Sequence, residues 1–267
     1  MPARWTRRLL LAAPALLATP GPAAAQHPSG VLARVLETRI LRLGVWLNTP
    51  PLGMRSDTGE PDGIDVELGR RLAAAMDVRL QVVPLDGRER FAAVLRGRVD
   101  ILGSISVVPQ TLLRLAFAAP HGDLCVVMVT RPGLGIRSIA DLAGRRIALP
   151  AGMFITDFVH TRLPEGAEVY AYADQAECLD ALLAAEVDAT PALDWNINAL
   201  LIQDPASALE VAFRLGIWRH GFAVNQGEHD MLRLVNTFLE LARTDGTLAD
   251  VRQTYAGTAL TMCTAPP

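Results

Sequence analysis

The residues that could do chemistry in this sequence form none of the common catalytic or metal-binding patterns. Gly103-Ser104-Ile105-Ser106 lacks the second glycine that the nucleophile elbow of serine hydrolases requires. Gly133-Leu134-Gly135 lacks the third glycine of a dinucleotide-binding loop, and we interpret it as a turn. The five histidines include no HExxH motif and no metal-site pairing with a cysteine. The sequence therefore predicts no catalytic residue, no metal site and no cofactor.

Lysine is absent, because all 25 basic residues are arginine. A Walker-type phosphate loop and a Schiff-base enzyme each need a lysine amine, which arginine does not replace. Apolar residues make up 51% and charged residues 20% of the 267-residue chain. This composition excludes lysine chemistry and is typical of a globular protein with one large domain or two modest ones.

Residues 1–25 have the features of a secretory signal peptide. Three arginines precede the apolar run 9–18, and three alanines form a small-residue cleavage site before Gln26. Thr6-Arg7-Arg8 leaves both the general and the twin-arginine export routes open. We therefore expect a periplasmic protein whose mature chain begins with an N-terminal lead over residues 26–37.

The mature chain is expected to be acidic and poor in cysteine. Loss of the signal removes three arginines and no acid, so the formal charge changes from −3 to −6. An acidic exported protein is a poor candidate for binding nucleic acid. Cys125, Cys178 and Cys263 allow at most one internal disulfide, and both a disulfide and buried free thiols are open.

Strands and helices are predicted to alternate along the first part of the chain. Compact apolar runs predict strands at 40–45, 80–83 and 99–102, and helices at 64–76 and 88–96 lie between them. Strands that alternate with helices form a parallel or mixed sheet with helices on its faces. We therefore predict an α/β fold.

A second series of the same kind begins at a strand expected over 125–129. It continues with a capped helix at 138–141 and a strand at 146–149. An amphipathic helix leads into Val99-Asp100 in the first series and into Val187-Asp188 in the second, 88 residues later. The repeat favours two related α/β lobes with a ligand between them, at the carboxyl ends of the strands.

Eight short motifs follow one another along the chain. They are Leu41–Gly44, Pro50-Pro51, Gly63–Leu68, Gly97–Ile101, Pro109 with Phe117 and Pro120, Ser138–Gly144, Val187–Ala189 and Asp245–Leu248. In this order and spacing they resemble the extracellular solute-binding proteins, family 3, the type that delivers polar amino acids to ABC importers. The resemblance covers about residues 41–256.

The resemblance implies a two-lobed α/β fold, type 2 of the periplasmic binding proteins, in which each lobe is a mixed sheet flanked by helices. Lobe 1 would comprise 38–124 and 220–267, and lobe 2 would comprise 127–218. Crossover strands would lie near 125–128 and 218–223. The family implies a monomer that closes on a small-molecule ligand by a hinge motion and docks on a membrane permease, without a catalytic group.

The resemblance also points to ligand-binding positions in lobe 1. Ser104 and Ser106 belong to a segment that leads to the arginine with which amino-acid receptors grip the α-carboxylate. Thr111 occupies that arginine position here, and Arg114, three residues later, is the alternative candidate.

Three further lobe 1 positions follow the opening strand. Trp46 stands where the family often has an acidic residue. Thr49 stands at the usual ring-stacking position, and Leu52 completes the same turn.

Lobe 2 departs from the family in a similar way. Met153 and Phe154 stand where a Gly-Thr-Thr/Ser element normally donates to the carboxylate. Asp194 lies one residue late for the ammonium-binding aspartate, and Trp195 follows it. These replacements predict a ligand that is not a standard α-amino acid and is apolar or cationic. Each tryptophan alone is equally well explained as a core residue.

Two other functions stay open at this point. Exported lyases of the cyclohexadienyl dehydratase kind resemble the same fold, although their carboxylate substrate also needs the missing arginine. A sensory or accessory binding protein without transport is the other alternative. The leading prediction is a non-enzymatic receptor of an ABC importer.

Overall fold

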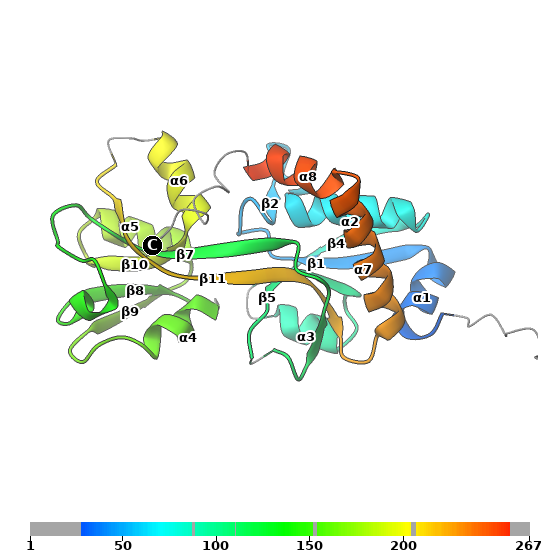
Figure 1. Cartoon of the computed structure of the whole chain (residues 1–267), viewed down its shortest axis with the longest axis horizontal. Helices are drawn as coiled ribbons and strands as arrows, with labels where there is room; N and C mark the ends of the chain where they lie inside the picture. Colours follow the sequence, from blue (N-terminus) through cyan, green and yellow to red (C-terminus); the bar gives the residue numbers. More distant parts are fainter. Residues whose placement is uncertain (1–27, 87–88, 110, 152–153, 204–206, 257–267) are drawn as a thin grey trace, which may run out of the picture.

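One β-sheet runs through the molecule and carries helices on its faces (Figure 1). The computed structural model describes residues 28–86, 89–109, 111–151, 154–203 and 207–256. Among these residues the strand order is β4-β1-β5-β11-β7-β10-β8-β9, and β6 pairs with β11. The fold is therefore mixed α/β, as the alternating pattern predicts.

The first half of the molecule is built around three parallel strands. β1 pairs in parallel with both β4 and β5, so the carboxyl ends of all three lie on one edge. Its strands are β1 (Ile40–Val45), β2 (Met54–Arg55), β3 (Pro61–Asp62), β4 (Arg79–Pro84), β5 (Ile101–Ser106) and β6 (Leu115–Phe117). Its helices are α1 (Gly30–Thr38), α2 (Ile64–Ala75), α3 (Arg90–Leu95), α7 (His229–Thr244) and α8 (Thr247–Ala256).

Helices α2 and α3 lie on opposite faces of this part of the sheet (Figure 1). Leu68 and Leu72, four positions apart, form the buried stripe of α2. The N-terminal lead expected over residues 26–37 is largely helix α1, because Leu32 and Val35 are buried in the core and hold it there.

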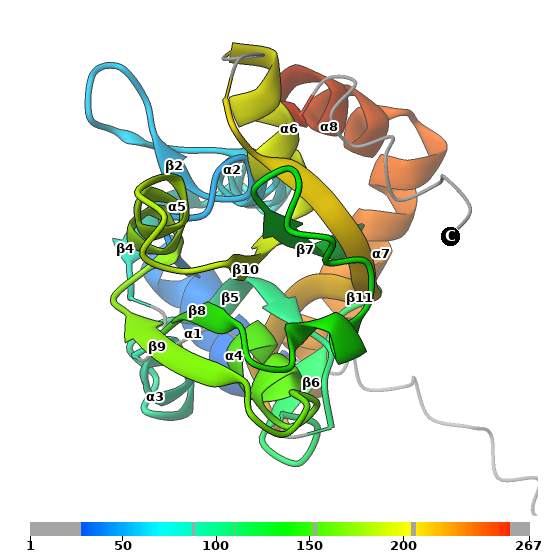
Figure 2. The ribbon, with the colours of Figure 1, turned by 90° about the vertical axis from the view of Figure 1, so that its left-hand side faces the viewer.

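The second half has the same parallel arrangement. β8 (Arg146–Pro150) lies between β10 (Ala189–Leu193) and β9 (Glu168–Tyr172) and runs parallel to both. Helices α4 (Phe154–His160) and α5 (Gln175–Leu183) lie on opposite sides of these strands (Figure 2). The 3-10 turn at Ile139–Leu142 and helix α6 (Asp194–Gln203) complete this half.

Two long strands, β7 (Gly122–Thr130) and β11 (Glu210–Asn225), connect the halves (Figure 1). They pair antiparallel with each other from Glu210 opposite Thr130 to His220 opposite Gly122. Both segments that the sequence predicts as crossovers fall on these strands. The exact lobe boundaries stay a prediction.

The strand register shows that the two carboxyl edges face each other. β5 ends at Ser106, opposite His220, which in turn lies opposite Gly122 of β7. β10 runs in the opposite direction and ends at Leu193, opposite Val126 of β7. The two edges are therefore separated along β7 by the four steps from Gly122 to Val126, or about 13 Å.

The repeated Val-Asp step has the same structural basis in both halves. Asp100 accepts hydrogen bonds from the backbone N–H of Arg42 (2.8 Å) and from its guanidinium Nη2 (2.6 Å). Asp188 accepts the same pair from Arg146, at 2.9 Å each. Each aspartate lies just before its strand and hydrogen-bonds to the neighbouring parallel strand. β5 begins after Asp100, at Ile101, whereas the sequence predicts its start at residue 99.

Candidate functional site

The carboxyl edge of the first half carries the predicted residues Trp46 and Ser104. Gly44 lies opposite Leu102, so the parallel register brings Trp46, just after β1, level with Ser104 of β5. Trp46 and Ser104 are both half-buried. Ser106, buried at the end of β5, lies opposite His220. This edge is therefore one side of the candidate site.

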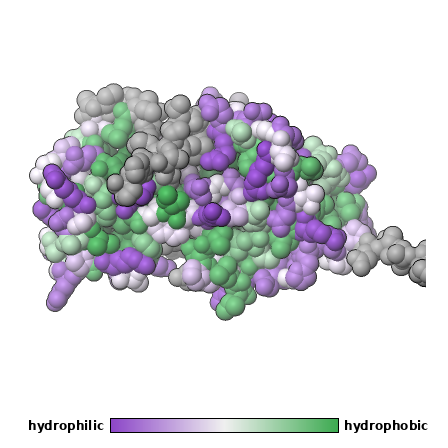
Figure 3. All heavy atoms as spheres, in the orientation of Figure 1, coloured by the Kyte–Doolittle hydropathy of each residue, from purple (hydrophilic) through white to green (hydrophobic). Residues whose placement is uncertain are grey.

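Thr111 does not present its hydroxyl to a ligand. Its Oγ1 donates to the backbone carbonyl of Val108 at 2.8 Å, and its backbone N–H donates to the same carbonyl at 3.0 Å. The residue is 8% exposed. Arg114 is exposed on the same loop, next to the exposed side chains of Leu112 and Leu113. The space-filling view shows a hydrophobic projection at the lower edge of the molecule (Figure 3).

The turn after β1 holds the start of helix α2. The backbone carbonyl of Leu52 accepts the N–H of Asp65 at 2.9 Å, and the Leu52 side chain is buried in the core. Thr49 closes the turn by accepting the N–H groups of Leu52 and Gly53. The Thr49 hydroxyl is buried without a hydrogen-bond partner among the described residues. The Leu52 side chain therefore packs in the core, whereas the Thr49 hydroxyl has no hydrogen-bond partner among the described residues.

A cation that the sequence does not single out lies over Trp46. The guanidinium carbon of Arg90, the first residue of α3, is 5.0 Å from the centroid of the Trp46 ring and 5.9 Å from that of Phe91. Burial lowers the pKa of Arg90 to about 10, although the charges of Asp65 and Asp86 raise it. Arg90 keeps its charge at neutral pH.

A buried polar cluster lies directly behind this edge. It consists of Asp65 of α2, Ser104 of β5, His121 just before β7 and His220 of β11. Ser104 Oγ donates to Asp65 Oδ1 at 2.6 Å and lies 3.0 Å from His220 Nδ1. His121 Nε2 is 3.4 Å from Asp65 Oδ1, and the two imidazole rings are 5.0 Å apart. We name this set the hinge cluster, because it joins both long strands to the first half.

His121 and His220 are each only 3% exposed, and no pattern in the sequence indicates this burial. Burial is the main reason that the pKa of His220 lies well below its ordinary value of 6.5. The neighbouring His121 and Arg252 lower this pKa further. His220 is therefore neutral at pH 7. A neutral His220 that carries its proton on Nδ1 can donate to Ser104 Oγ.

The second half places Asp194 and Trp195 at the carboxyl end of β10, at the start of α6. Asp194 is 4% exposed, and its Oδ1 accepts the backbone N–H of Trp195 at 2.8 Å. Trp195 is 3% exposed in the main core, with no hydrogen-bond partner for its indole N–H among the described residues. Phe154 begins α4, and Met153 lies outside the described residues.

The cysteines contribute no described disulfide. Cys125 and Cys178 are buried and form no disulfide bond among the described residues, and Cys263 lies outside them. Burial raises the pKa of the Cys178 thiol to about 12, so this thiol is protonated at neutral pH.

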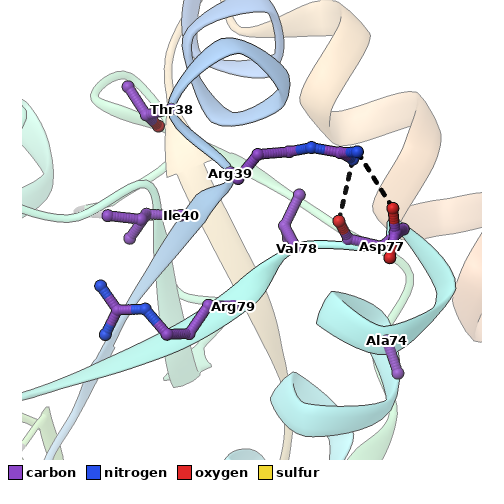
Figure 4. Close-up of a pocket in the computed structure, with 7 residues that line it drawn as sticks. All are labelled: Thr38, Arg39, Ile40, Ala74, Asp77, Val78 and Arg79. Atoms are coloured by element: carbon purple, nitrogen blue, oxygen red, sulfur yellow. Dashed lines mark hydrogen bonds and ion pairs between the residues drawn. The ribbon is translucent and has the colours of Figure 1, made fainter.

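A recess of about 850 Å³ lies at the opposite edge of the first half, at the amino ends of β1 and β4 (Figure 4). It is lined by Thr38, Arg39, Ile40, Ala74, Asp77, Val78 and Arg79. Arg39 Nη2 is 3.1 Å from Asp77 Oδ2, and Arg39 Nη1 donates to the Asp77 carbonyl. The charges of Arg39 and Asp77 therefore satisfy each other, and the recess lies away from every predicted site residue.

The described residues contain no group of three or more His, Cys, Asp or Glu side chains arranged to hold a metal ion. In the same part of the chain, no helix is both long and apolar enough to cross a membrane.

Comparisons with known proteins agree with this architecture. The chain is 25% identical over 238 residues to a probable amino-acid ABC transporter-binding protein of Haemophilus influenzae, covering 88% of this chain and 91% of that protein. A solute receptor for L-cysteine of Neisseria gonorrhoeae has the same fold, with a TM-score of 0.77 at 23% identity over 88% of this chain and 97% of that one.

The ancestral amino acid-binding protein AncCDT-1, a precursor of cyclohexadienyl dehydratase, gives a TM-score of 0.76 at 20% identity over 85% of this chain and 100% of that one. The sequence model of the bacterial extracellular solute-binding proteins, family 3, matches residues 41–258. This match spans most of the chain and includes both facing strand edges and both connecting strands, and the chain therefore belongs to the bacterial extracellular solute-binding proteins, family 3.

Proposed function

We propose that this protein is the periplasmic receptor of an ABC importer, which captures a small molecule between its two halves and delivers it to a membrane permease. The observation that carries the proposal is the pair of carboxyl strand edges that face each other across Gly122–Val126. Ligands of open α/β sheets bind at such edges. Two connecting strands allow the halves to close by a hinge motion.

The ligand is proposed to be a small molecule that is not held as an ordinary α-amino acid is held. The hydroxyl of Thr111 is used within its own turn, so the family's carboxylate grip has no counterpart at that position. Arg90 already lies over the face of Trp46, which disfavours a cationic ligand group on that indole. The apolar alternative is compatible with these contacts.

A ligand screen tests the receptor proposal. Residues 26–267 are purified and unfolded by heat in the presence of amino acids, amines, betaines and small organic acids. A ligand at about a hundred times its Kd stabilises the folded protein by roughly 2.7 kcal/mol, which raises the Tm measurably. Isothermal titration of each hit then gives the affinity.

Micromolar or tighter binding of one solute class supports a receptor. Turnover of a bound solute without a transporter would instead favour the dehydratase-like alternative. Absence of any stabilisation across the panel would contradict the receptor proposal. Uptake of the solute in cells, lost on deletion of the receptor or of the permease, separates transport from a sensory or accessory role.

A further inference from the structure

The hinge cluster lies where the two connecting strands leave the first half. Ser106, the last residue of β5, lies opposite His220 of β11, and β7 begins opposite the same histidine. From Trp218 towards the second half, β11 pairs only with β7 among the described strands. The register between β5 and β11 also shifts between Gly221 and Ala223. The cluster therefore lies at an irregular end of the β5–β11 pairing, next to the stretch that bends when the halves move.

One carboxylate oxygen in this cluster faces two donor groups. Asp65 Oδ1 accepts the hydroxyl of Ser104 at 2.6 Å, and the same oxygen lies 3.4 Å from His121 Nε2. Both ring nitrogens of His121 are buried without a hydrogen-bond partner among the described residues. Leaving a buried polar group unpaired is costly. His121 therefore has a hydrogen-bonding capacity, directed at Asp65, that the present arrangement does not use.

The Ser104 hydroxyl connects this carboxylate to β11. Because the hydroxyl gives its only proton to Asp65, its oxygen accepts from His220 Nδ1, 3.0 Å away. Ser104 makes both contacts at a backbone φ of 27°, which is costly for a residue with a side chain. Loss of the bond to Asp65 would therefore let the backbone of Ser104 relax and would weaken its contact with β11.

The charges around the two rings limit the cluster to one added proton. The rings of His121 and His220 are 5.0 Å apart, so a proton on one disfavours a proton on the other. Burial, the neighbouring His121 and the charge of Arg252 on α8 lower the pKa of His220, whereas the carboxylate of Asp65 lies beside His121. Other charged groups on the packed elements are Arg90 of α3, Arg243 of α7 and, exposed on the strands themselves, Asp123 and Arg219.

We propose that Asp65, Ser104 and His121 form a proton-sensitive switch at the start of the connecting strands. Uptake of a proton by His121 makes its Nε2–H a charged donor to Asp65 Oδ1, and this bond forms in place of the one from Ser104. The pairing of β5 with β11 then loosens, while β7 becomes more firmly attached to α2. The switch goes beyond the receptor function proposed above and acts in the ligand-free protein. If that function holds, the switch makes ligand affinity depend on pH.

The competing explanation is that His121 only fills space against Phe222, whose ring centroid is 4.7 Å from its own. A space-filling role predicts that acid weakens all strand pairs alike, through global unfolding. Two backbone amides separate the explanations. The N–H of Val107 donates to the Arg219 carbonyl at 3.0 Å and reports on the contact of the β5 end with β11. The N–H of His121 donates to the His220 carbonyl at 3.1 Å and reports on the contact of the β7 start with β11.

The test is amide hydrogen exchange of ligand-free residues 26–267, measured residue by residue by NMR between pH 8 and pH 5. Protection factors are compared, because they remove the ordinary effect of pH on exchange. The protection of Val107 is expected to fall on acidification by up to about tenfold per pH unit, the limit for uptake of one proton. The protection of His121 is expected to stay constant or rise. Ring nitrogen chemical shifts in the same samples show at which pH His121 takes up its proton.

Three variants accompany these measurements. His121→Phe keeps a packed ring without a nitrogen and is expected to abolish the pH effect at Val107. Asp65→Asn removes the carboxylate charge and is expected to do the same. The matched control, His160→Asn, removes an exposed histidine of α4 and is expected to leave the effect unchanged. If His121→Phe and Asp65→Asn do not fold, as judged by circular dichroism, the wild type decides, because its loss of protection at Val107 must coincide with the titration of the His121 ring.

Equal losses of protection at Val107 and His121, or a pH effect that persists in His121→Phe, would overturn the switch and leave the receptor function intact. Constant protection of Val107 from pH 8 to pH 5, or a loss that does not coincide with the His121 titration, would overturn it as well. Because no ligand is added, an empty ligand screen would contradict the receptor function without affecting this result.

Discussion

At the scale of single residues, the hinge cluster combines a strained backbone position with polar side chains that contact one another. Ser104 has a positive φ of 27°, which is costly for a residue with a side chain, and its hydroxyl contacts Asp65 and His220. Gly122 is required next to it, because a Cβ there would overlap the His220 ring. The local backbone is therefore shaped to keep these polar side chains together and out of water.

Acidification is expected to destabilise the protein through His220. Its folded pKa lies below 6.5 because of burial and the adjacent His121 and Arg252, so above about pH 6.5 both folded and unfolded states are neutral. Below that value the unfolded chain takes up the proton first. The free energy of unfolding should then fall by up to about 1.4 kcal/mol per pH unit until the folded pKa is reached.

Urea unfolding at pH 7.5, 6.5 and 5.5 measures this slope. His220→Asn does not titrate and retains an amide donor for Ser104, so its stability is expected to depend less on pH over this range. Equal slopes for wild type and His220→Asn would show that other groups dominate the acid response.

Residue-level prediction depends on local signals and misses spatial ones. Trp46 follows a recognisable strand and Ser104 belongs to a segment of the family resemblance, and the register places both at one carboxyl edge. That they contact a ligand stays a prediction. Arg90 and the partners of Ser104 carry no such signal. Ser104 and His220 are 116 positions apart, and only the pairing of β5 with β11 brings them together.

At the scale of elements, the two Val-Asp steps explain why the halves look alike in sequence. In each half, an aspartate before one strand binds the backbone and the guanidinium of an arginine on the neighbouring strand. The repeat was visible in the sequence, but its arginine partners were not, because they lie about 40 to 60 residues away. The start of β5 was accordingly misplaced by two residues.

Asp100→Asn is expected to cost about 3 kcal/mol of unfolding free energy, because it removes a buried charge and leaves Arg34 and Arg42 without it. The matched control is Asp77→Asn. Asp77 also pairs with an arginine, at 3.1 Å, but its side chain is 90% exposed. Its loss should cost less than about 1 kcal/mol. Chemical unfolding of both variants checks the contrast, and similar losses would mean that Asp100 is effectively solvated.

At the scale of the whole molecule, the repeated strand-helix pattern was enough to predict two α/β halves, and the site between them stays a prediction. The pattern did not predict that one sheet continues through both halves, because periodicity does not show that β7 and β11 stay paired along nine residues of β7. A continuous pair of strands restricts the relative motion of the halves to bending and twisting of the stretch that connects them. Trp218 lies in this stretch, opposite Leu124.

Ligand binding is expected to change the emission of Trp218. Its ring lies 4.6 Å from that of Phe158 on α4, edge to face, so bending of β11 alters this contact. A variant with Trp46→Phe and Trp195→Phe leaves Trp218 as the reporter in the mature chain. A shift in its emission on ligand addition, together with a smaller radius of gyration in X-ray scattering, would indicate closure. Compaction without any change at Trp218 would place the hinge elsewhere.

The length of β11 also sets the order in which the protein can fold. This strand completes the sheet of the first half beside β5, yet it is made only after β7, β8, β9 and β10 of the second half. Until β11 has been synthesised, the edge of β5 in the first half is unpaired. The second half can already assemble, because its strands are close to one another in sequence. A chain with this topology cannot complete the sheet of its first half until β11 has been synthesised.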